Sequence, residues 1–137
     1  VTGVQTCAFR SGVSLSSPAV YTDPAGLNTY TGPVSTITVA WDDNDTPDHK
    51  LERIITQKWL AMFPLGLEAW ADYRRTGYPM LMPVKVNNSG GVVSSERGAR
   101  RLSYPQEERR NNLENYNAAV GMLSGADNMA TDVWWAK

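Results

Sequence analysis

The sequence predicts a mainly α-helical fold with long irregular loops and one small β-hairpin. Apolar side chains recur at helical spacing on both sides of Phe63-Pro64, and both runs carry signals for helix starts or ends. Between such runs the chain is rich in glycine, proline, serine and asparagine, which is typical of loops. The 137 residues are enough for one ordinary domain.

The first helix is expected to begin just after Thr46, whose hydroxyl can accept a hydrogen bond from the first turn. Pro47 has a backbone angle suited to a first helical residue, and Asp48 favours the positive end of the helix dipole. The apolar residues that follow share one stripe: Leu51, Ile54, Ile55, Trp59, Met62 and Phe63. Pro64 should end the helix, because the residue before a proline avoids helical geometry.

The second helix is expected from about Leu65 to Thr76. One face of it contains Leu67, Trp70, Ala71 and Arg74. Arg74 and Arg75 lie in the last turn, where cations favour the helix dipole, and Gly77 suits a left-handed cap. Two helices separated by a proline predict an αα-hairpin or a sharply kinked pair.

Short β segments are expected on both sides of this helical region. Residues 36–41 alternate and are β-branched, which predicts a short strand. Residues 84–86 and 92–93 predict a hairpin around the loop 87–91, which reads NNSGG. Residues 12–32 are rich in Ser, Pro, Thr and Gly and are expected to form a loop.

A third helix is expected after Asn112, which can cap it. Its apolar face contains Leu113, Tyr116, Val120 and Leu123. Gly125 should end this helix. The tail that follows is too aromatic for a solvated end, so Trp134 or Trp135 is expected to dock on the body of the protein.

The overall composition argues against several classes of protein. With 42% hydrophobic and 20% charged residues, the chain is expected to be globular rather than disordered. A formal net charge of -1 argues against a nucleic-acid partner bound through phosphate contacts. No apolar run approaches the roughly 20 residues that span a bilayer, and no signal-peptide pattern opens the chain.

Residues 1–11, VTGVQTCAFRS, have neither helical nor strand periodicity. They resemble the translation of a sequencing-library adapter, so we expect the native sequence to start near Gly12, where the gene would be truncated. The alternative is an ordinary extended N-terminal segment. If the segment is foreign, Cys7, the only cysteine, is uninformative about redox compartment or nucleophilic chemistry.

No cofactor or metal is expected from the acidic run and the single histidine. A calcium loop of the EF-hand type needs glycine at its sixth position and glutamate at its twelfth, and neither the register from Asp42 nor that from Asp43 satisfies this. An acidic turn that leads into a helix cap is the favoured interpretation. His49 lacks a second nitrogen or sulfur ligand for zinc in the native sequence, so a partly exposed surface histidine is favoured.

Several carboxylates could supply the pair that glycoside hydrolysis needs: Asp45, Asp48, Glu52, Glu68 and Asp72. Glu68 and Asp72 are four residues apart and share one helical face, which more often marks a solvated surface or a pairing with nearby arginines. The interpretation as a catalytic pair therefore stays an alternative, and we assign no catalytic residue.

A group of aromatic side chains could form a platform on which sugar rings stack: Trp41, Trp70, Tyr73, Tyr78, Trp134 and Trp135. Core packing is favoured for Trp59 and Trp70, which lie on the apolar stripes. Arg74 and Arg75 could bind an anion, but they are expected to bond helix carbonyls and local carboxylates or to pack on aromatic rings.

The run from Ile55 to Phe63, ITQKWLAMF, and the run from Gly66 to Pro79, GLEAWADYRRTGYP, resemble the C-terminal part of SusD/RagB-family lipoproteins, in particular the SusD-like branch. The segment RLSYP at 101–105 and the ending with GADNMAT and WWAK at 125–137 resemble the closing segments of the same family. The resemblance extends over about 34–137.

The resemblance implies a mainly helical fold with tetratricopeptide-like helix pairs, of which residues 12–137 would be a C-terminal part truncated at its N-terminus. It also implies a lipoprotein on the outer-membrane surface of Gram-negative bacteria, anchored through an N-terminal lipidated cysteine that this chain lacks. Such a protein captures glycan or another nutrient without catalysis and covers a SusC-type TonB-dependent transporter. No ligand-contact residue can be carried over to this sequence, so the ligand-binding residues stay unknown.

Two alternatives to nutrient capture remain open. One is a polysaccharide-processing hydrolase that uses Glu68 and Asp72, and the other is a structural helical module without a ligand. We also expect the isolated chain to be poorly soluble, because a truncated helical domain exposes apolar faces that the rest would cover.

Overall fold

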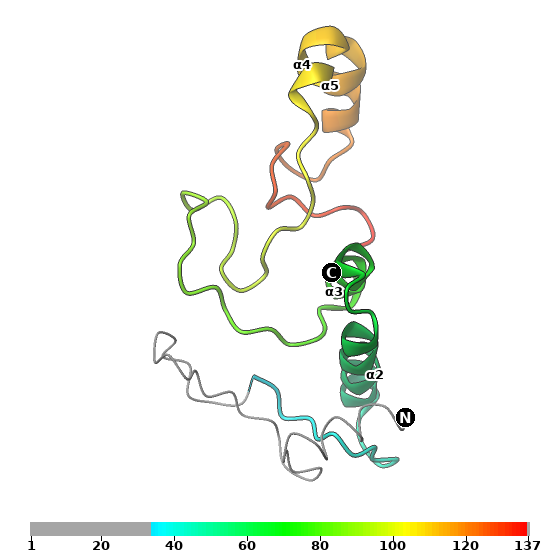
Figure 1. The fold of residues 1–137 in the computed structure, drawn as a ribbon. Helices are drawn as coiled ribbons and strands as arrows, with labels where there is room; N and C mark the ends of the chain where they lie inside the picture. Colours follow the sequence, from blue (N-terminus) through cyan, green and yellow to red (C-terminus); the bar gives the residue numbers. More distant parts are fainter. Residues whose placement is uncertain (1–33, 137) are drawn as a thin grey trace. The chain divides into compact units, whose positions relative to one another are not determined.

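The computed structural model describes residues 34–136 and contains four helices in this range (Figure 1). They are α2 (Pro47–Ala61), α3 (Gly66–Thr76), α4 (Gln106–Asn111) and α5 (Leu113–Gly121). No strand forms between residues 34 and 136, and long irregular segments connect the helices. The predicted mainly helical fold is confirmed, while the suspected adapter segment 1–11 and the expected loop 12–32 lie outside the described residues.

The chain divides into two compact units. Among the described residues, the first unit contains 34–73 and 77–82, and therefore α2 and most of α3. The second unit contains 74–76 and 83–136, and therefore α4 and α5. None of the helices in the described range is long and apolar enough to cross a bilayer.

Helix α2 begins as the sequence predicts. The Thr46 hydroxyl accepts a hydrogen bond from the backbone N–H of His49 at 3.2 Å, and Pro47 is the first helical residue. The helix ends at Ala61, shortly before Pro64. The predicted start and stop signals of this helix are therefore confirmed.

Helix α3 ends at Gly77, whose φ of 80° is left-handed and whose N–H donates to the Tyr73 carbonyl at 2.8 Å. The αα-hairpin predicted for α2 and α3 is wrong, and the kinked-pair alternative describes them: in Figure 1 α3 lies beyond the end of α2, and the two helices do not pack along their lengths. The buried residues of α3 are Ala69, Asp72, Arg74 and Thr76, whereas Leu67 on its predicted apolar face is exposed.

The strand predicted at 36–41 is not formed. Its backbone groups bond to side chains instead of to a neighbouring strand: the N–H of Ile37 donates to the Ser35 hydroxyl at 3.1 Å, and the Thr38 carbonyl accepts from the Arg53 side chain at 3.0 Å. The β-branched pattern therefore did not produce a strand, because the described residues supply no partner strand.

The small β-hairpin predicted from 84–86 and 92–93 is also wrong. Side chains close this loop: the Asn87 amide donates to the Val93 carbonyl at 2.6 Å, and the N–H of Val93 donates to the Ser89 hydroxyl at 3.0 Å. These side-chain bonds occupy backbone groups that a strand ladder would need. The segment is an irregular loop.

Helix α5 confirms the third predicted helix, but it ends at Gly121 rather than at the predicted Gly125, so Leu123 lies outside it. Asn112 precedes it, but its side-chain amide donates to Glu108 at 2.9 Å and makes no cap bond within α5. Helix α4, against which α5 packs, was not predicted. The signal for α4 was present, because Glu107 and Glu108 lie in its first turn and Arg109 in its last, as the helix dipole favours.

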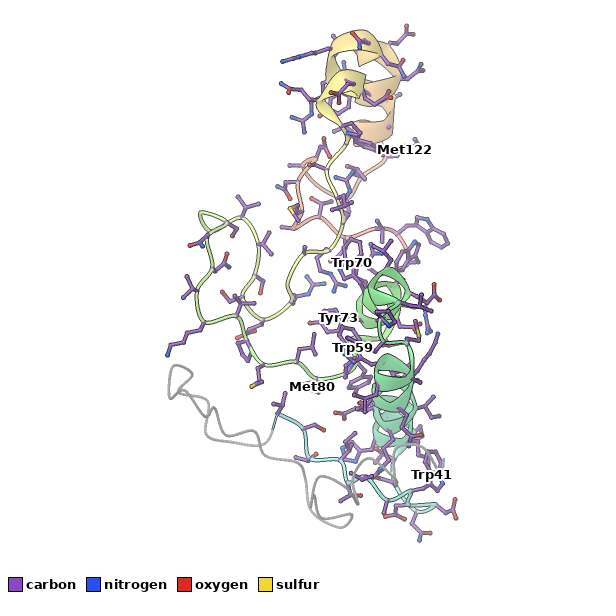
Figure 2. All side chains as sticks on the ribbon, in the orientation of Figure 1. Trp41, Trp59, Trp70, Tyr73, Met80 and Met122 are labelled. Carbon is purple, nitrogen blue, oxygen red and sulfur yellow. The ribbon has the colours of Figure 1, made fainter. Side chains whose placement is uncertain are left out.

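The buried residues of the described region are mostly polar. Three apolar residues are buried, Ile55, Ala69 and Pro79. The buried polar and charged residues are Glu52, Arg53, Asp72, Arg74, Thr76, Arg100 and Arg101. Trp59 and Trp70 are half-buried on α2 and α3 (Figure 2), so their predicted packing role is partly realised.

Candidate functional site

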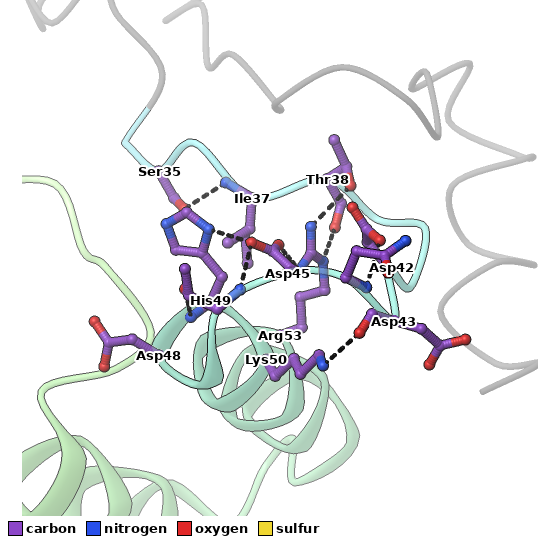
Figure 3. Close-up of polar contacts among 12 residues, drawn as sticks. Ser35, Ile37, Thr38, Asp42, Asp43, Asp45, Asp48, His49, Lys50 and Arg53 are labelled. Carbon is purple, nitrogen blue, oxygen red and sulfur yellow. Dashed lines mark hydrogen bonds and ion pairs between the residues drawn. The ribbon is translucent and has the colours of Figure 1, made fainter.

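A polar cluster fixes the entry into α2 (Figure 3). We call Thr38, Asp45, His49 and Arg53 the Asp45 cluster. The carboxylate of Asp45 accepts hydrogen bonds from the Thr46 N–H at 2.9 Å, from His49 Nδ1 at 2.8 Å and from Arg53. Arg53 is buried and also donates to the carbonyl and the hydroxyl of Thr38, at 3.0 and 3.1 Å.

The contacts in the Asp45 cluster lower the pKa of the Asp45 side chain. The bond from Arg53 is the main cause that lowers the pKa of Asp45 from 3.8 to about 2, and the contact with His49 acts in the same direction. His49 is therefore a partly exposed partner of Asp45, in agreement with its predicted surface role.

The rest of the acidic run is used within its own turn. The Asp42 carboxylate accepts from the Asn44 N–H at 2.9 Å, and the Asp43 carboxylate accepts from the Trp41 indole N–H at 2.8 Å. Within residues 34–136 no three His, Cys, Asp or Glu side chains gather closely enough to hold a metal ion. The arrangement is that of an acidic turn leading into a helix cap, as interpreted from the sequence.

A second polar cluster is centred on Asp127. We call Arg101, Tyr104, Arg109, Tyr116 and Asp127 the Asp127 cluster. One carboxylate oxygen of Asp127 accepts from Arg101 at 2.6 Å and from the Tyr104 N–H at 3.0 Å. The other oxygen accepts from Arg109 at 2.7 Å and from the Tyr116 hydroxyl at 3.1 Å. The Asp127 side chain is only 4% exposed, and its buried carboxylate accepts hydrogen bonds from four donors.

Aromatic rings complete the Asp127 cluster. The Arg101 guanidinium lies over the Tyr104 ring at 4.8 Å, and the Arg109 guanidinium lies over the Tyr116 ring at 5.4 Å. The two tyrosine rings meet edge to face at 6.0 Å. Burial by itself raises the pKa of Asp127, but the bonds from Arg101, from the Tyr104 N–H and from Arg109 outweigh it and hold the pKa well below 3.8.

A third cluster lies in the same unit and contains Arg74, Arg97, Arg100, Asp132 and Trp135. We call it the Asp132 cluster. Asp132 accepts from Arg100 at 2.5 Å and from Arg97 at 2.8 Å. Arg74 and Arg100 each donate to the backbone carbonyl of the other, both at 3.0 Å. Burial alone raises the pKa of Asp132, and the bonds from Arg100 and Arg97 lower it overall.

The Asp132 cluster explains how the aromatic tail docks. The guanidinium of Arg74 lies over the Trp135 ring at 4.7 Å, which confirms that one of the two terminal tryptophans packs on the body and that Arg74 stacks on a ring. Trp134, its neighbour, is 95% exposed. The two indoles are therefore in opposite environments.

The carboxylates predicted as possible catalytic groups are in unlike environments. Glu68 is exposed, whereas Asp72, on the same helix, is buried and pairs with Lys58 at 2.5 Å. Asp48 accepts from the Tyr78 hydroxyl at 2.7 Å, a bond that is the main cause raising the pKa of Tyr78 to about 12. Glu52 is buried, and its Oε1 has no hydrogen-bond partner among the described residues.

The aromatic residues considered for a sugar platform are also divided. Trp41 and Trp134 are exposed, at 46% and 95%. The others are half-buried: Trp70, Tyr73, Tyr78 and Trp135. Two of the six are therefore exposed, of which only Trp134 is almost fully exposed, and the two lie in different units.

Sequence reasoning did not find the two acids on which the second unit depends. Asp127 lies 26 residues from Arg101 and 18 from Arg109 along the chain, and Asp132 lies 32 from Arg100. No local pattern links residues so far apart. The only available signal was the resemblance of the segments at 101–105 and 125–137 to known closing segments, and the structure shows that these segments bond to one another.

Comparison with known proteins assigns this arrangement to a family. A family model described as "SusD-like: Susd and RagB outer membrane lipoprotein" matches residues 11–136. A SusD homologue from Bacteroides uniformis ATCC 8492 is 54% identical with a TM-score of 0.83, over 98% of this chain and 30% of its own. No curated protein matches.

Two further solved structures agree. A chitin-binding SusD homologue from Flavobacterium johnsoniae is 44% identical with a TM-score of 0.78, over 97% of this chain and 30% of its own. A SusD homologue from Bacteroides thetaiotaomicron VPI-5482 is also 44% identical, with a TM-score of 0.77, over 98% of this chain and 32% of its own. This chain therefore spans about a third of the length of these structures.

Proposed function

Because this chain belongs to the SusD-like family of outer membrane lipoproteins, we propose that it is the C-terminal part of a cell-surface protein that binds glycan. The complete protein would be anchored to the outer membrane by an N-terminal lipid and would deliver its ligand to a SusC-type TonB-dependent transporter. The family match over residues 11–136 is the observation that carries the proposal.

The ligand class is supported by a relative. The homologue from Flavobacterium johnsoniae, 44% identical to this chain, is described as chitin-binding. Exposed indoles suit the flat CH faces of pyranose rings, and this chain presents Trp41 and Trp134 to solvent. We propose a glycan of this general kind rather than a charged ligand, because the buried arginines Arg53, Arg100 and Arg101 are already bonded to aspartates or carbonyls.

The chemistry proposed for the chain is binding without bond cleavage. A glycosidase needs one carboxylic acid and one carboxylate on opposite sides of the scissile bond. Asp72 is buried against Lys58, while Glu68 on the same helix is exposed, so the two do not share an environment. The three polar clusters instead bond loops and helix ends to one another, which is a structural role.

The proposal is tested by recovering the gene with its flanking DNA. We expect a lipoprotein signal upstream in the same reading frame and a neighbouring gene for a SusC-type transporter. An isolated short gene with neither feature would contradict the proposal. The same DNA decides whether residues 1–11 belong to the native protein.

The product of that gene then tests the ligand. In affinity electrophoresis through gels that contain soluble chitin oligosaccharides or other glycans, we expect the protein to be retarded by at least one glycan without shortening it. Release of shorter sugars that is abolished by Glu68→Gln or Asp72→Asn would favour the hydrolase. Retardation by no glycan would favour a structural module.

A further inference from the structure

Four exposed apolar side chains surround the turn between α2 and α3. Leu60 is 57% exposed, Phe63 88%, Leu65 65% and Leu67 79%, and we call these four residues the turn cluster. All four belong to the first unit. The chain carries no charged residue from 59 to 67, between Lys58 and Glu68.

The exposure of the turn cluster is unusual, because the helices beside it bury polar residues instead. Helix α3 buries Asp72 and Thr76, both polar, while Leu67 on the same helix lies in water. An amphipathic helix of a complete domain normally directs its apolar face inward. A large group of exposed apolar side chains without charges among them normally marks a contact surface.

We propose that the turn cluster is the docking surface for the remainder of a SusD-like polypeptide, the part of the fold that this chain does not span. Nearly all of this chain, 98%, superposes on the Bacteroides uniformis homologue with a TM-score of 0.83, and the match occupies only 30% of that protein. A large body of polypeptide is therefore available in the complete fold to cover the turn.

The absence of charged residues favours the remainder of the polypeptide, over a second copy or a separate partner, as the part that covers the turn cluster. The fully buried core of a contact is depleted in charged residues, whereas surfaces that meet separate partners keep polar and charged residues at their rims. Residues 59–67 contain none, so their composition resembles the interior of a domain. A second copy of this chain and a separate protein partner are the competing occupants.

Thiol labelling tests the proposal independently of glycan binding. The probe is Phe63→Cys in a Cys7→Ser background, placed in two proteins: this chain alone, and a chimaera in which this chain replaces the matched segment of the Bacteroides uniformis homologue. The control is Glu68→Cys in the same two proteins, because Glu68 is exposed, charged and adjacent to the turn cluster. Labelling with a small maleimide is followed by mass spectrometry.

We expect position 63 to label at least about tenfold more slowly in the folded chimaera than in the chain alone, and position 68 to label at similar rates in both. Equal changes at the two positions, or fast labelling of position 63 in the folded chimaera, would overturn the proposal. If the chimaera does not fold, cysteine is placed at the two aligned positions of the homologue itself, whose fold is known, and the same difference decides.

Sedimentation of the isolated chain tests whether a second copy of the chain, instead of the remainder of the polypeptide, covers the turn cluster. A dimer that Phe63→Asp converts to monomer, together with fast labelling of position 63 in the chimaera, would assign the surface to a second copy and contradict the proposal. Slow labelling in the chimaera supports it, whatever the oligomeric state of the isolated chain.

Discussion

The two units of this chain differ in what stabilises them. The second unit bonds its closing segment through arginines that converge on Asp127 and Asp132, and these groups are satisfied among the described residues. The first unit has one comparable polar cluster, around Asp45, and leaves the turn cluster exposed at its other end. The polar contacts of the second unit are therefore complete among the described residues, although it also exposes apolar residues such as Leu102 and Met122, whereas the exposed apolar residues of the turn cluster follow one another closely in the sequence.

The polar clusters explain how long loops can be ordered with so little apolar burial. A buried charge is tolerated when its partners supply hydrogen bonds, and removal of one partner leaves the other buried and unpaired. Ile55, Ala69 and Pro79 are the buried apolar residues in the described range, so pairs of opposite charges stabilise much of what an apolar core stabilises in other proteins.

Acid is expected to have the largest effect, because it discharges all three clusters. Asp45, Asp127 and Asp132 have pKa values below the ordinary 3.8, and that of Asp45 is about 2. A carboxylate with a lowered pKa contributes stability that is complete above pH 3.8 and is lost as the pH falls through its folded value. The thermal midpoint, followed by circular dichroism, should be flat from about pH 7 to 5 and fall steeply below about pH 4. A midpoint that falls mainly between pH 7 and 5 would contradict the prediction.

The next largest effect is expected for Asp127→Asn. The substitution removes the charge that balances buried Arg101 and should cost about 3 kcal/mol of unfolding free energy, measured with urea. Glu107→Gln is the matched control, because Glu107 is an exposed acid on α4, and it should change the value by less than about 0.5 kcal/mol. Similar losses for the two variants would show that the Asp127 cluster is not the main tie of the second unit.

A smaller effect is expected for the tail. Trp135→Ala removes the half-buried ring beneath Arg74 and should cost about 2 kcal/mol, less than the truncation of a fully buried aromatic residue. Trp134→Ala removes a ring that is 95% exposed and should change stability by less than about 0.5 kcal/mol. Urea unfolding measures both variants, and an equal cost would mean that the two indoles are not in opposite environments.

The sequence predicted what depends on neighbours in the chain and missed what depends on distant partners. Thr46 and Gly77 act within one turn of their own helices, so the ends of α2 and α3 were predictable. Asp127 has no such local signal, because its partners come from residues 101–116. The apolar stripe that starts at Leu51 was a correct sign of α2, but Phe63 at its end lies beyond the helix and is exposed. Periodicity alone does not predict what will cover an apolar side chain.

The smallest effect is expected for Tyr78→Phe in the first unit. The variant loses the hydrogen bond to Asp48 and about 1 kcal/mol of stability at pH 7. Tyr78 has a raised pKa of about 12, so its contribution is complete below pH 10.0 and is lost as the pH rises through 12. Urea unfolding at pH 8 and pH 11 should therefore bring the parent and the variant closer together at the higher pH. An unchanged difference would contradict the assigned pKa shift.

Hydrogen–deuterium exchange tests the central contrast most directly, when this chain alone is compared with the Bacteroides uniformis chimaera. We expect the amides of residues 60–67 to exchange at least about tenfold more slowly in the chimaera. The amides of Arg100 and Tyr104, which donate to Met129 and Asp127, should be slow in both proteins. Equal exchange of residues 60–67 in the two proteins, or slowing confined to the second unit, would contradict the account.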